Sequence, residues 1–378
     1  MRIGIFVQPV AVSQKTGISR YTVGLVEALL ELGTDDLFYL YYRRQKNDPV
    51  KDWLAGHPRV VHRGFAFPDI DERPKWWWDY YLPARLVLDR ISVFHSPSHI
   101  VPSFGPPSVV TIHDLAYYFM KVKGEGLDRY LKRWTDRSMK LATKVTAVSQ
   151  STANDCIGQG VDREKVHVIY QGFESAVSDP ASVLSEDSAF PDSQSLLQKG
   201  YVLFMGTMQP RKNVPYLVEE YARVASQVSW DLVLAGAPGE SSDDVARSID
   251  RFGVGDRVHQ LGFVDDQQRA SLYRNAAVFA YPSRYEGFGL VVLEAMSYGV
   301  PVVASSNSSL PEAVGGAGTL VDVDREGSLA EAILELHDRA ELRHSHVEKG
   351  YKHVQRFSWE ASAAQMLELY YQAASARR

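Results

Sequence analysis

The stretch YPSRYEGFGLVVLEAMSYGVPVVAS, residues 281–305, decides the fold of the second half of this chain. Its pattern predicts the end of a strand, a turn broken by glycines, a helix and a second strand. Glu286 lies in the turn. If the helix begins near Gly289 or Leu290, Glu294 lies about one turn into it, at roughly 3.6 residues per turn. One carboxylate is therefore expected on the loop and the other on the helix.

The same stretch offers an anion site between the two carboxylates. The amides of Phe288, Gly289 and Leu290 lie at the expected helix N-terminus, where unpaired N–H groups and the helix dipole favour an anion. Carboxylates suit hydroxyl-rich groups such as a sugar and a ribose, and the amides suit a phosphate. The combination fits a nucleotide sugar.

Composition limits the class of protein. A chain of 378 residues suits two domains, and 45% hydrophobic with 23% charged residues is typical of a globular protein. The single cysteine, Cys156, excludes an internal disulfide and makes a reducing cytoplasm the expected location. No apolar run approaches a membrane span, and the net charge of −5 gives no indication of nucleic-acid binding.

Strand-like runs alternate with helical ones along the chain, which predicts an α/β fold with parallel sheets built from βαβ units. A loop at 16–20 is expected to precede a helix at 21–32, and Ser149 is expected to begin a helix. The last expected helix is amphipathic and contains Trp359 near its start. The expected strands cover 2–7, 37–43, 92–97, 108–114, 145–148, 166–173, 201–207, 231–236, 258–264, 278–283, 301–306 and 318–322.

Residues 174–199 separate the two halves. They hold seven serines, two prolines and five acidic residues without a sustained period, which predicts a linker. The expected domains are therefore 1–180 and 200–357.

Two segments of the first half are unusual. Residues 75–88 contain Trp76, Trp77 and Trp78, and predict either a helix packed on the sheet or an aromatic wall for an acceptor sugar or lipid. Residues 121–144 hold eight basic and three acidic residues with an apolar side. They predict either a solvated surface helix or a basic amphipathic helix on an anionic membrane.

Polar residues follow several expected strands. Arg211 and Lys212 come after the Gly206 turn, where a guanidinium fork and an ammonium could meet a diphosphate. His113 and Asp114 end a strand, and are either a capped histidine or a contact for a sugar hydroxyl.

The chain contains two Asp-x-Asp pairs that could bind a metal ion, Asp69 with Asp71 and Asp322 with Asp324. Neither pair has an evident third oxygen ligand, so no metal site is expected. The chain also lacks HExxH, P-loop and GxSxG signatures.

Seven motifs together resemble those of family-4 retaining glycosyltransferases with the GT-B fold, and most of all bacterial mannosyltransferases of O-antigen and surface-polysaccharide assembly. The motifs are TGISRYT, TIHD, TAVSQST, IYQGF, GTMQPRKN, EGFGLVVLEA and GVPVVAS. The resemblance implies two Rossmann-like domains facing a central cleft, with the donor held mainly by the second. It also implies that a final crossover helix, 358–378, returns to the first domain.

The resemblance also implies roles for single residues. Glu294 would bind the ribose and Glu286 the donor sugar. The diphosphate would meet Arg211, Lys212 and the amides at 288–290, beside Gly206. In the first domain, Gly17 would approach the donor phosphate or the acceptor and His113 the transferred sugar. Residues expected near the cleft or acceptor are Ser149, Asp114, Trp76, Trp77 and Trp78. The chain departs from the family at Ser19, where a second glycine is usual, and this weakens the role of that loop.

The implied reaction is metal-independent transfer of a hexose without a cofactor. GDP-mannose is the preferred donor, with UDP-glucose or another UDP-hexose as the alternative. The acceptor would be a glycan or a polyprenyl-linked oligosaccharide, and contact with the inner face of the cytoplasmic membrane would run through 121–144. A nucleotide-sugar epimerase and a non-catalytic nucleotide-sugar binder are the rival classes.

Overall fold

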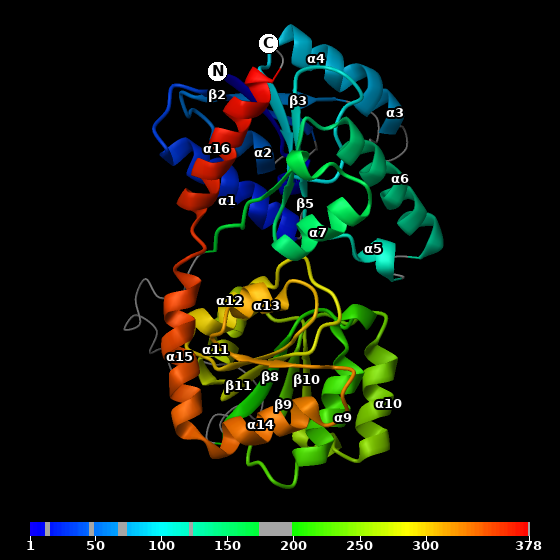
Figure 1. The fold of residues 1–378 in the computed structure, drawn as a ribbon, viewed down its shortest axis with the longest axis vertical. Helices are drawn as coiled ribbons and strands as arrows, with labels where there is room; N and C mark the ends of the chain where they lie inside the picture. The colour runs from blue at the N-terminus through cyan, green and yellow to red at the C-terminus, as the bar shows by residue number, and fades with distance from the viewer. Residues whose placement is uncertain (12–15, 45–48, 67–73, 121–123, 174–198, 377–378) are drawn as a thin grey trace. The chain divides into compact units, whose positions relative to one another are not determined.

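The computed structural model describes residues 1–11, 16–44, 49–66, 74–120, 124–173 and 199–376, and the chain in it divides into two compact units (Figure 1). Unit 1 contains residues 1–172 and 357–378, and unit 2 contains residues 173–356. The predicted linker at 174–199 lies outside the described residues except for its last residue.

Unit 1 is built on a seven-stranded parallel sheet with the order β3-β2-β1-β4-β5-β6-β7. Five of its strands are almost fully buried, as expected where helices cover both faces of a parallel sheet. The strands are β1 (Arg2–Phe6), β2 (Leu37–Arg43), β3 (Val60–Phe65), β4 (Val93–Ser96), β5 (Ser108–Ile112), β6 (Lys144–Ala147) and β7 (Val166–Val168).

The helices of unit 1 lie between these strands and at the C-terminus. They are η1 (Gln8–Ala11), α1 (Gly17–Glu31), α2 (Pro49–Asp52), α3 (Pro74–Trp76), the π-helix η2 (Trp77–Tyr81), α4 (Leu82–Leu88), α5 (Ala116–Phe119), α6 (Glu125–Leu141), α7 (Gln150–Gly158), η3 (Arg163–Lys165) and α16 (Trp359–Ser375).

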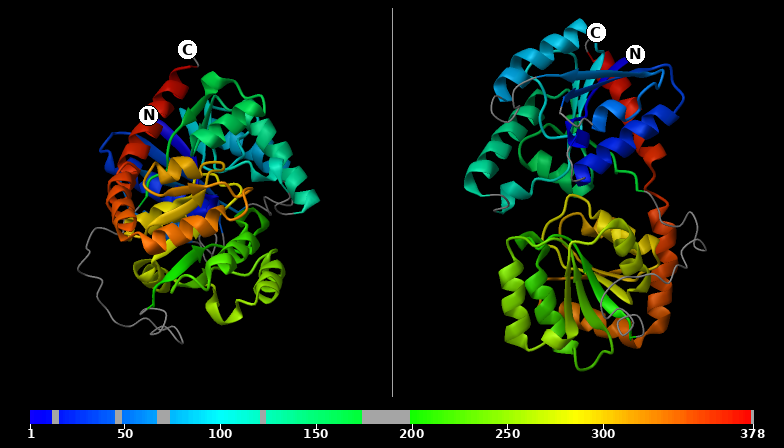
Figure 2. Two further views of the ribbon diagram at one scale, coloured as in Figure 1. Left: turned by 60° about the horizontal axis from the view of Figure 1, so that its bottom comes forward. Right: turned by 180° about the vertical axis from the view of Figure 1, so that it is seen from behind.

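Helix α16 lies along α1, as the different views show (Figure 2). The Trp359 ring at its start occupies space that two glycines leave open. A Cβ on Gly24 would lie 2.3 Å from Trp359 Cε2, and one on Gly172 would lie 2.3 Å from Trp359 Cγ. The absence of side chains at these glycines therefore allows the C-terminal helix to dock closely on unit 1.

Unit 2 repeats the architecture with a six-stranded parallel sheet of order β10-β9-β8-β11-β12-β13. Strands β8 and β11 are parallel neighbours in the middle of this sheet, and Val202 of β8 pairs with Val278 of β11. The strands are β8 (Tyr201–Met205), β9 (Asp231–Ala235), β10 (Val258–Gly262), β11 (Val278–Tyr281), β12 (Val302–Ser305) and β13 (Thr319–Val321).

Helices connect these strands, and α9 contacts α10 and α14 while α12 contacts α13 and α15. They are η5 (Pro210–Lys212), α9 (Val214–Val224), α10 (Ser242–Phe252), η6 (Gly255–Arg257), α11 (Asp266–Asn275), α12 (Leu290–Ser297), α13 (Leu310–Val314), α14 (Ser328–Asp338) and α15 (Ala340–Val354). Ligands of open α/β sheets bind beyond the carboxyl ends of the strands, so a ligand site in unit 2 is expected at the loops after β8, β11 and β12.

The predicted parallel α/β fold is confirmed, with one strand missed and one helix placed too late. Strand β3 at the sheet edge has no fully buried residue, so it lacks the apolar run that marked the other strands. Helix α1 begins at Gly17, so the predicted loop at 16–20 is wrong. Thr16 Oγ1 accepts from the Ser19 amide at 3.3 Å and Ser19 Oγ accepts from the Thr16 amide at 3.2 Å, a capping box that starts the helix early.

Candidate active site

Glu286 forms the centre of the polar site at the carboxyl edge of the unit 2 sheet. Its Oε1 atom accepts hydrogen bonds from Lys212 Nζ at 2.5 Å, Ser283 Oγ at 2.7 Å and Tyr281 Oη at 3.0 Å. Its Oε2 atom lies 2.8 Å from an Arg211 guanidinium nitrogen. The basic pair after β8 and the carboxylate after β11 therefore meet in one buried cluster.

Hydrogen bonds to backbone carbonyl groups hold the two loops of this cluster together. The Arg211 carbonyl accepts from the Arg284 amide at 2.7 Å and from Ser283 Oγ at 2.9 Å. The Arg211 guanidinium donates to the Tyr285 carbonyl at 3.1 Å. These contacts join the η5 turn to the loop after β11, so the positions of Arg211 and Glu286 depend on each other.

The loop after β12 supports Glu286 from another direction. Ser308 Oγ donates to the Glu286 carbonyl at 2.6 Å, and Ser309 Oγ donates to the same carbonyl at 2.9 Å. Ser308 has a positive φ of 55°, an uncommon conformation for a residue with a side chain. The Glu286 backbone is consequently fixed by two hydroxyl groups.

The charge of Glu286 is strongly stabilised. Burial would raise the pKa of the carboxyl group, but the cations Lys212 and Arg211 and the hydrogen bonds from Lys212 and Ser283 outweigh it and lower the pKa to about 2. Glu286 is therefore a carboxylate at neutral pH, with both oxygens engaged by donors.

Glu294 lies on α12, which begins at Leu290 as the sequence pattern predicted. Tyr273 Oη donates to Glu294 Oε2 at 3.0 Å, and an Arg269 guanidinium nitrogen lies 3.6 Å from Oε1. Burial, followed by the Glu294 charge, raises the pKa of Tyr273 well above its usual value. Both contacts come from α11, which therefore orients this second carboxylate.

Glycine is required where α12 begins. Gly289 has a φ of 103°, and a Cβ there would lie 2.8 Å from Leu310 Cδ2. Phe288 before it is buried, and Leu290 is the first residue of the helix. The amides at 288–290 thus lie at a helix N-terminus, as predicted, next to the loop that carries Glu286.

Gly206, at the end of β8, also has a conformation that favours glycine, with a φ of 152°. A Cβ on the neighbouring Gly236 would lie 2.0 Å from the Gly206 carbonyl oxygen, so the backbones after β8 and β9 approach closely. This close approach leaves little bulk at the sheet edge beside Lys212.

In unit 1, His113 follows β5 and has a defined tautomer. Its Nε2 atom lies 2.8 Å from the Pro97 carbonyl, which can only accept, so Nε2 carries the proton and Nδ1 is the acceptor atom. Burial lowers the pKa of His113, and the ring lies edge-on to Tyr21 at 4.7 Å. Asp114 Oδ1 accepts from the Ala116 amide at 3.0 Å and thereby caps the following turn.

Gly17 and Ser149 each lie at the start of a helix. Gly17 is the first residue of α1, and a Cβ there would meet no atom within 4 Å. Ser149 is the buried N-cap of α7, and its Oγ accepts from the Thr152 amide at 3.0 Å. The hydroxyl of Ser19 donates to the Pro9 carbonyl at 2.6 Å, which explains why serine fits at a position where the family usually has glycine.

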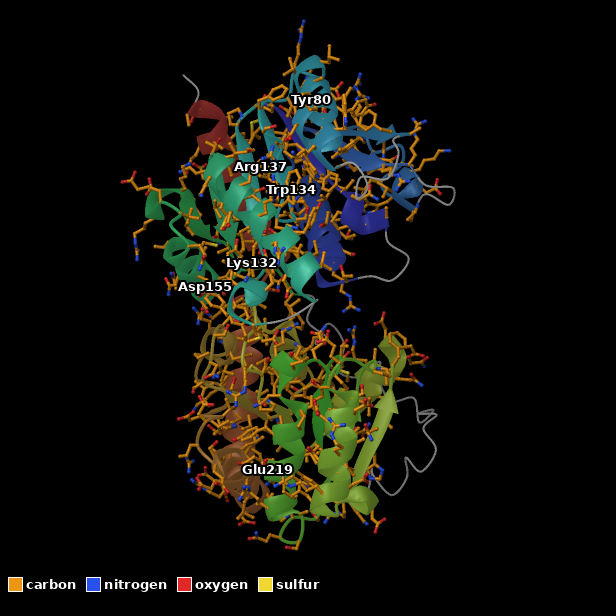
Figure 3. All side chains as sticks on the ribbon, turned by 90° about the vertical axis from the view of Figure 1, so that its right-hand side faces the viewer. Tyr80, Lys132, Trp134, Arg137, Asp155 and Glu219 are labelled. Atoms are coloured by element: carbon orange, nitrogen blue, oxygen red, sulfur yellow. The ribbon has the colours of Figure 1, made fainter. Side chains whose placement is uncertain are left out.

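Both unusual segments of unit 1 are helical (Figure 3), and for 75–88 the alternative of a helix packed on the sheet is confirmed. Trp77 and Trp78 are buried in the core, so an aromatic wall made of these two rings is wrong, whereas Trp76 is 61% exposed. Helix α6 buries Trp134 and Met139, so most of the apolar side predicted for membrane contact packs inside the unit instead. His95, at the carboxyl half of β4, is also buried, between the hydroxyl groups of Thr111 and Tyr370.

Comparisons with known proteins show the family to which this chain belongs. Residues 15–176 match the family described as Glycosyltransferase Family 4, and residues 199–339 match Glycosyl transferases group 1. O-antigen chain mannosyltransferase B of Escherichia coli is 30% identical over 368 residues, which cover 94% of this chain and 96% of that protein. The chain belongs to glycosyltransferase family 4. It is a hexosyltransferase of that family.

Solved structures support the fold of this glycosyltransferase. Sucrose-phosphate synthase from Thermosynechococcus elongatus matches over 100% of both chains with a TM-score of 0.72 and 22% identity. Anabaena HepE in complex with UDP-glucose covers 98% of this chain and 100% of its own, with a TM-score of 0.71 and 22% identity. These similarities show the GT-B fold.

The residues that position the two carboxylates of the glycosyltransferase were not predicted from the sequence. Tyr281 and Ser283 lie within the quoted stretch, and the Pro-Ser pattern after a buried strand could have drawn attention to them. Ser308 and Arg269 left no such signal, because only the packing of α11 and the loop after β12 brings them to the site.

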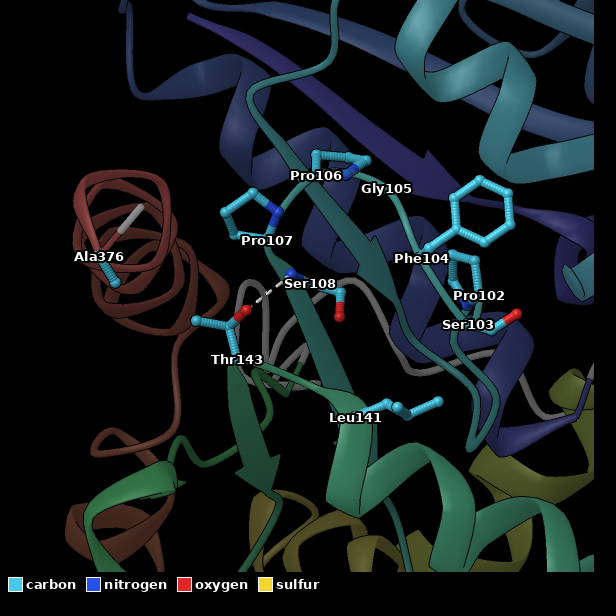
Figure 4. Close-up of a pocket in the computed structure, with 10 residues that line it drawn as sticks. All are labelled: Pro102, Ser103, Phe104, Gly105, Pro106, Pro107, Ser108, Leu141, Thr143 and Ala376. Carbon is cyan, nitrogen blue, oxygen red and sulfur yellow. Dashed lines mark hydrogen bonds between the residues drawn. The ribbon is translucent and has the colours of Figure 1, made fainter. Parts of the chain in front are cut away.

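A pocket of about 230 Å³ opens at the amino end of β5, opposite to the ligand edge of the sheet (Figure 4). Its lining residues are Pro102, Ser103, Phe104, Gly105, Pro106, Pro107, Ser108, Leu141, Thr143 and Ala376.

In the described ranges, no group of three His, Cys, Asp or Glu residues is placed to hold a metal ion. Asp69 and Asp71 lie outside those ranges. Asp322 Oδ1 accepts from the Asp324 amide at 2.9 Å, so the second predicted pair forms a local turn. None of the described helices combines the length and apolarity needed to cross a membrane.

Proposed function

We propose that this glycosyltransferase moves mannose from GDP-mannose to a glycan or polyprenyl-linked acceptor, with retention of the anomeric configuration. The observation that carries the proposal is the Glu286–Lys212–Arg211 cluster at the carboxyl edge of the unit 2 sheet. Mannose is favoured because a relative that spans almost the whole chain is named as a mannosyltransferase. The alternative is a UDP-hexose donor.

Donor binding in this proposal uses groups that already lie together in unit 2. Lys212, Arg211 and the amides at the start of α12 stabilise the diphosphate, and this charge also stabilises the transition state in which the diphosphate leaves. Glu286 accepts hydrogen bonds from donor-sugar hydroxyls, and Glu294 accepts from the ribose. Since the protein's own cations hold the diphosphate, transfer is expected to continue in the presence of a chelator.

Transfer itself exchanges one bond for another. The acceptor hydroxyl oxygen bonds to the anomeric carbon on the face from which the diphosphate leaves, and the bond between that carbon and the phosphate oxygen breaks. The acceptor proton passes to the leaving phosphate. Glu286 positions the sugar and forms no covalent bond. This role is supported by the side chains of Lys212, Ser283 and Arg211, which already bind both carboxylate oxygens.

Unit 1 residues complete the proposal. His113, neutral and with Nδ1 as its acceptor atom, accepts a hydrogen bond from a hydroxyl of the transferred sugar. Gly17 lies at the start of α1, where a Cβ would meet no atom within 4 Å, so the open space there is assigned to substrate. Ser149, buried after β6, is assigned to holding the start of α7 beside the substrate. A role for Asp114 and Trp76 in acceptor binding stays a prediction.

Product analysis with a panel of sugar nucleotides tests the function. Incubation with GDP-mannose and a polyprenyl-linked acceptor should yield GDP and a mannosylated product. An isomerised nucleotide sugar would instead identify an epimerase, and binding without turnover of any donor would identify a non-catalytic binder. A thermal-shift comparison of GDP, UDP and ADP tests the base, because a ligand that binds only the native state raises its stability. Stabilisation by UDP alone would overturn the GDP assignment.

A further inference from the structure

Five buried polar side chains of unit 1 form one hydrogen-bonded network around three neighbouring strands of its sheet. Strands β4, β5 and β6 each contribute one member, and helices α1 and α16 each contribute a tyrosine. A buried polar group without a partner is costly, so a buried set of this size is expected to be fully paired. The members are His95, Thr111, Thr146, Tyr21 and Tyr370, each at most 2% exposed.

The network centres on the hydroxyl group of Thr111. His95 Nε2 lies 2.8 Å from Thr111 Oγ1, and Thr146 Oγ1 lies 2.8 Å from the same atom. Tyr21 Oη lies 3.3 Å from it. The other ring nitrogen of His95, Nδ1, lies 2.6 Å from Tyr370 Oη. Helix α16 is therefore joined to α1 through two side chains of the sheet.

One arrangement of protons satisfies every group of the network. Thr146 Oγ1 lies 3.3 Å from the Val110 carbonyl, which can only accept, so the Thr146 proton points there. Thr111 consequently donates to Thr146. The Thr111 oxygen accepts from His95 Nε2 and from Tyr21 Oη. His95 then carries its proton on Nε2, and its Nδ1 accepts from the tyrosine of α16.

The protonation of two members agrees with this arrangement. Burial raises the pKa of Tyr21 to about 12, so its hydroxyl group keeps its proton at neutral pH. Burial, followed by the charge of His113, lowers the pKa of His95 to about 3, so this ring stays neutral. A buried polar network that is fully satisfied rigidifies its members. Tyr21 is therefore held firmly at its hydroxyl end.

The ring of Tyr21 contacts the ring of His113. Their centroids lie 4.7 Å apart and their planes are nearly perpendicular, at 87°. The hydrogen bond from His113 Nε2 to the Pro97 carbonyl fixes one atom of the imidazole, and the perpendicular contact fixes its plane. Tyr21 also contacts Trp359 at the start of α16, with ring centroids 5.9 Å apart. The direction of His113 Nδ1, the acceptor atom, thus depends on Tyr21.

We propose that Tyr21 is a positioning residue of the transfer reaction, which aims His113 Nδ1 at the transferred sugar. The inference rests on the role proposed above for His113. Tyr21 touches no substrate atom in this assignment and acts through the imidazole ring that it contacts. A displacement of about 1 Å costs up to about 100-fold in rate, so a contact that fixes this ring supports transfer. Tyr370 and His95 extend the support of Tyr21 to α16.

A double-variant cycle tests whether Tyr21 acts through His113. Tyr21→Leu removes the ring and should lower kcat about tenfold, as His113→Ala does, while the KM for the donor changes little. The two substitutions together should be no slower than His113→Ala alone, because the ring that Tyr21 positions is then absent. Tyr21→Phe keeps the ring and loses only the hydrogen bond to Thr111, so it should lower kcat about threefold.

Nitrogen NMR of the imidazole rings in the full chain gives a readout without substrate. Wild-type protein should show His95 and His113 protonated at Nε2. In Tyr21→Leu the His113 signals should shift toward a mixture of the two tautomers, since the ring is free to turn. The matched control is Tyr41→Phe, which removes a buried hydroxyl group of unit 1 that donates to Asp89 Oδ2 at 2.9 Å. It should change neither kcat nor the His113 signals.

The outcomes separate this inference from the proposed function. It is overturned if the losses of Tyr21→Leu and His113→Ala multiply in the double variant, or if the His113 signals of Tyr21→Leu match those of wild type. If circular dichroism shows Tyr21→Leu unfolded, the same cycle with Tyr21→Phe decides, and a loss that persists beside His113→Ala overturns it. An unchanged kcat in His113→Ala, or no transfer from any donor, would overturn the proposed sugar contact and this inference with it.

Discussion

Lys212 Nζ lies 2.5 Å from Glu286 Oε1, so a lysine that follows β8 and a carboxylate that follows β11 share one buried ion pair. The pair is 74 residues apart in the chain. In the absence of donor the carboxylate satisfies the cations that we assign to the diphosphate. A donor phosphate that arrives must therefore share Lys212 and Arg211 with Glu286, which links sugar positioning to diphosphate binding.

Lys212→Ala should abolish most transfer. Loss of one preorganised charge at a leaving group costs about 10²- to 10³-fold in kcat. The substitution also leaves Glu286 buried with Arg211 as its remaining cation, which should lower the free energy of unfolding by about 1–3 kcal/mol. Initial-rate kinetics and urea unfolding measure the two effects. Lys165→Ala, which removes a lysine from unit 1, is the control, and near-normal turnover of Lys212→Ala would remove the residue from the site.

Glu286→Gln should change how stability depends on pH. The pKa of Glu286 falls from an unfolded value of 4.5 to about 2, so the carboxylate stabilises the fold above pH 4.5 and loses this effect as the pH falls through 2. The shift corresponds to about 3 kcal/mol. Urea unfolding of wild type between these pH values should show this loss, and the glutamine variant should lack that component. Parallel curves for the two proteins would contradict the shift.

Gly24→Ala should destabilise unit 1, because the added Cβ would lie 2.3 Å from the Trp359 ring. Overpacking of this kind costs about 1–3 kcal/mol in the free energy of unfolding. Combination with Trp359→Leu should make the cost of Gly24→Ala smaller, since the ring that clashes is gone. Denaturant unfolding of the single and double variants gives the coupling. Additive effects would show that α16 does not dock through this contact.

His113→Ala should lower kcat about tenfold, the worth of one hydrogen bond to the reacting sugar. Binding of GDP should not change, because His113 belongs to unit 1. Burial lowers the pKa of His113, so wild-type activity should persist below the ordinary histidine pKa of 6.5 and fall only as the pH passes through the lowered value. The control is His344→Ala, which replaces a largely exposed histidine. An unchanged kcat in His113→Ala would contradict the sugar contact.

Much of the fold could be read from the order of residues. Apolar runs in β8, β9 and β11 predict buried parallel strands, since each is buried along its whole length. The start of α12 was predicted correctly from Gly289 and the residues that follow it, because helix initiation depends on a few adjacent residues. Strand β3 escaped detection because an edge strand that is only half-buried needs no apolar run.

The candidate site was only partly readable. Arg211, Lys212 and Glu286 stood out because each follows a predicted strand, and Glu294 because it lies about one turn into a predicted helix. The pairing of Glu286 with Arg211 and Lys212 could not be predicted from the sequence. It depends on the parallel register that places the ends of β8 and β11 at one edge of the sheet.

The βαβ alternation, the family motifs and the start of α12 after a glycine can be read from the residues in order, because each depends on neighbours in the chain. The three-dimensional packing, in contrast, sets which tryptophan of 76–78 reaches solvent, and it pairs the carboxylate of Glu286 with Lys212. Both outcomes depend on contacts between residues far apart in the chain, and local periodicity carries no information about them.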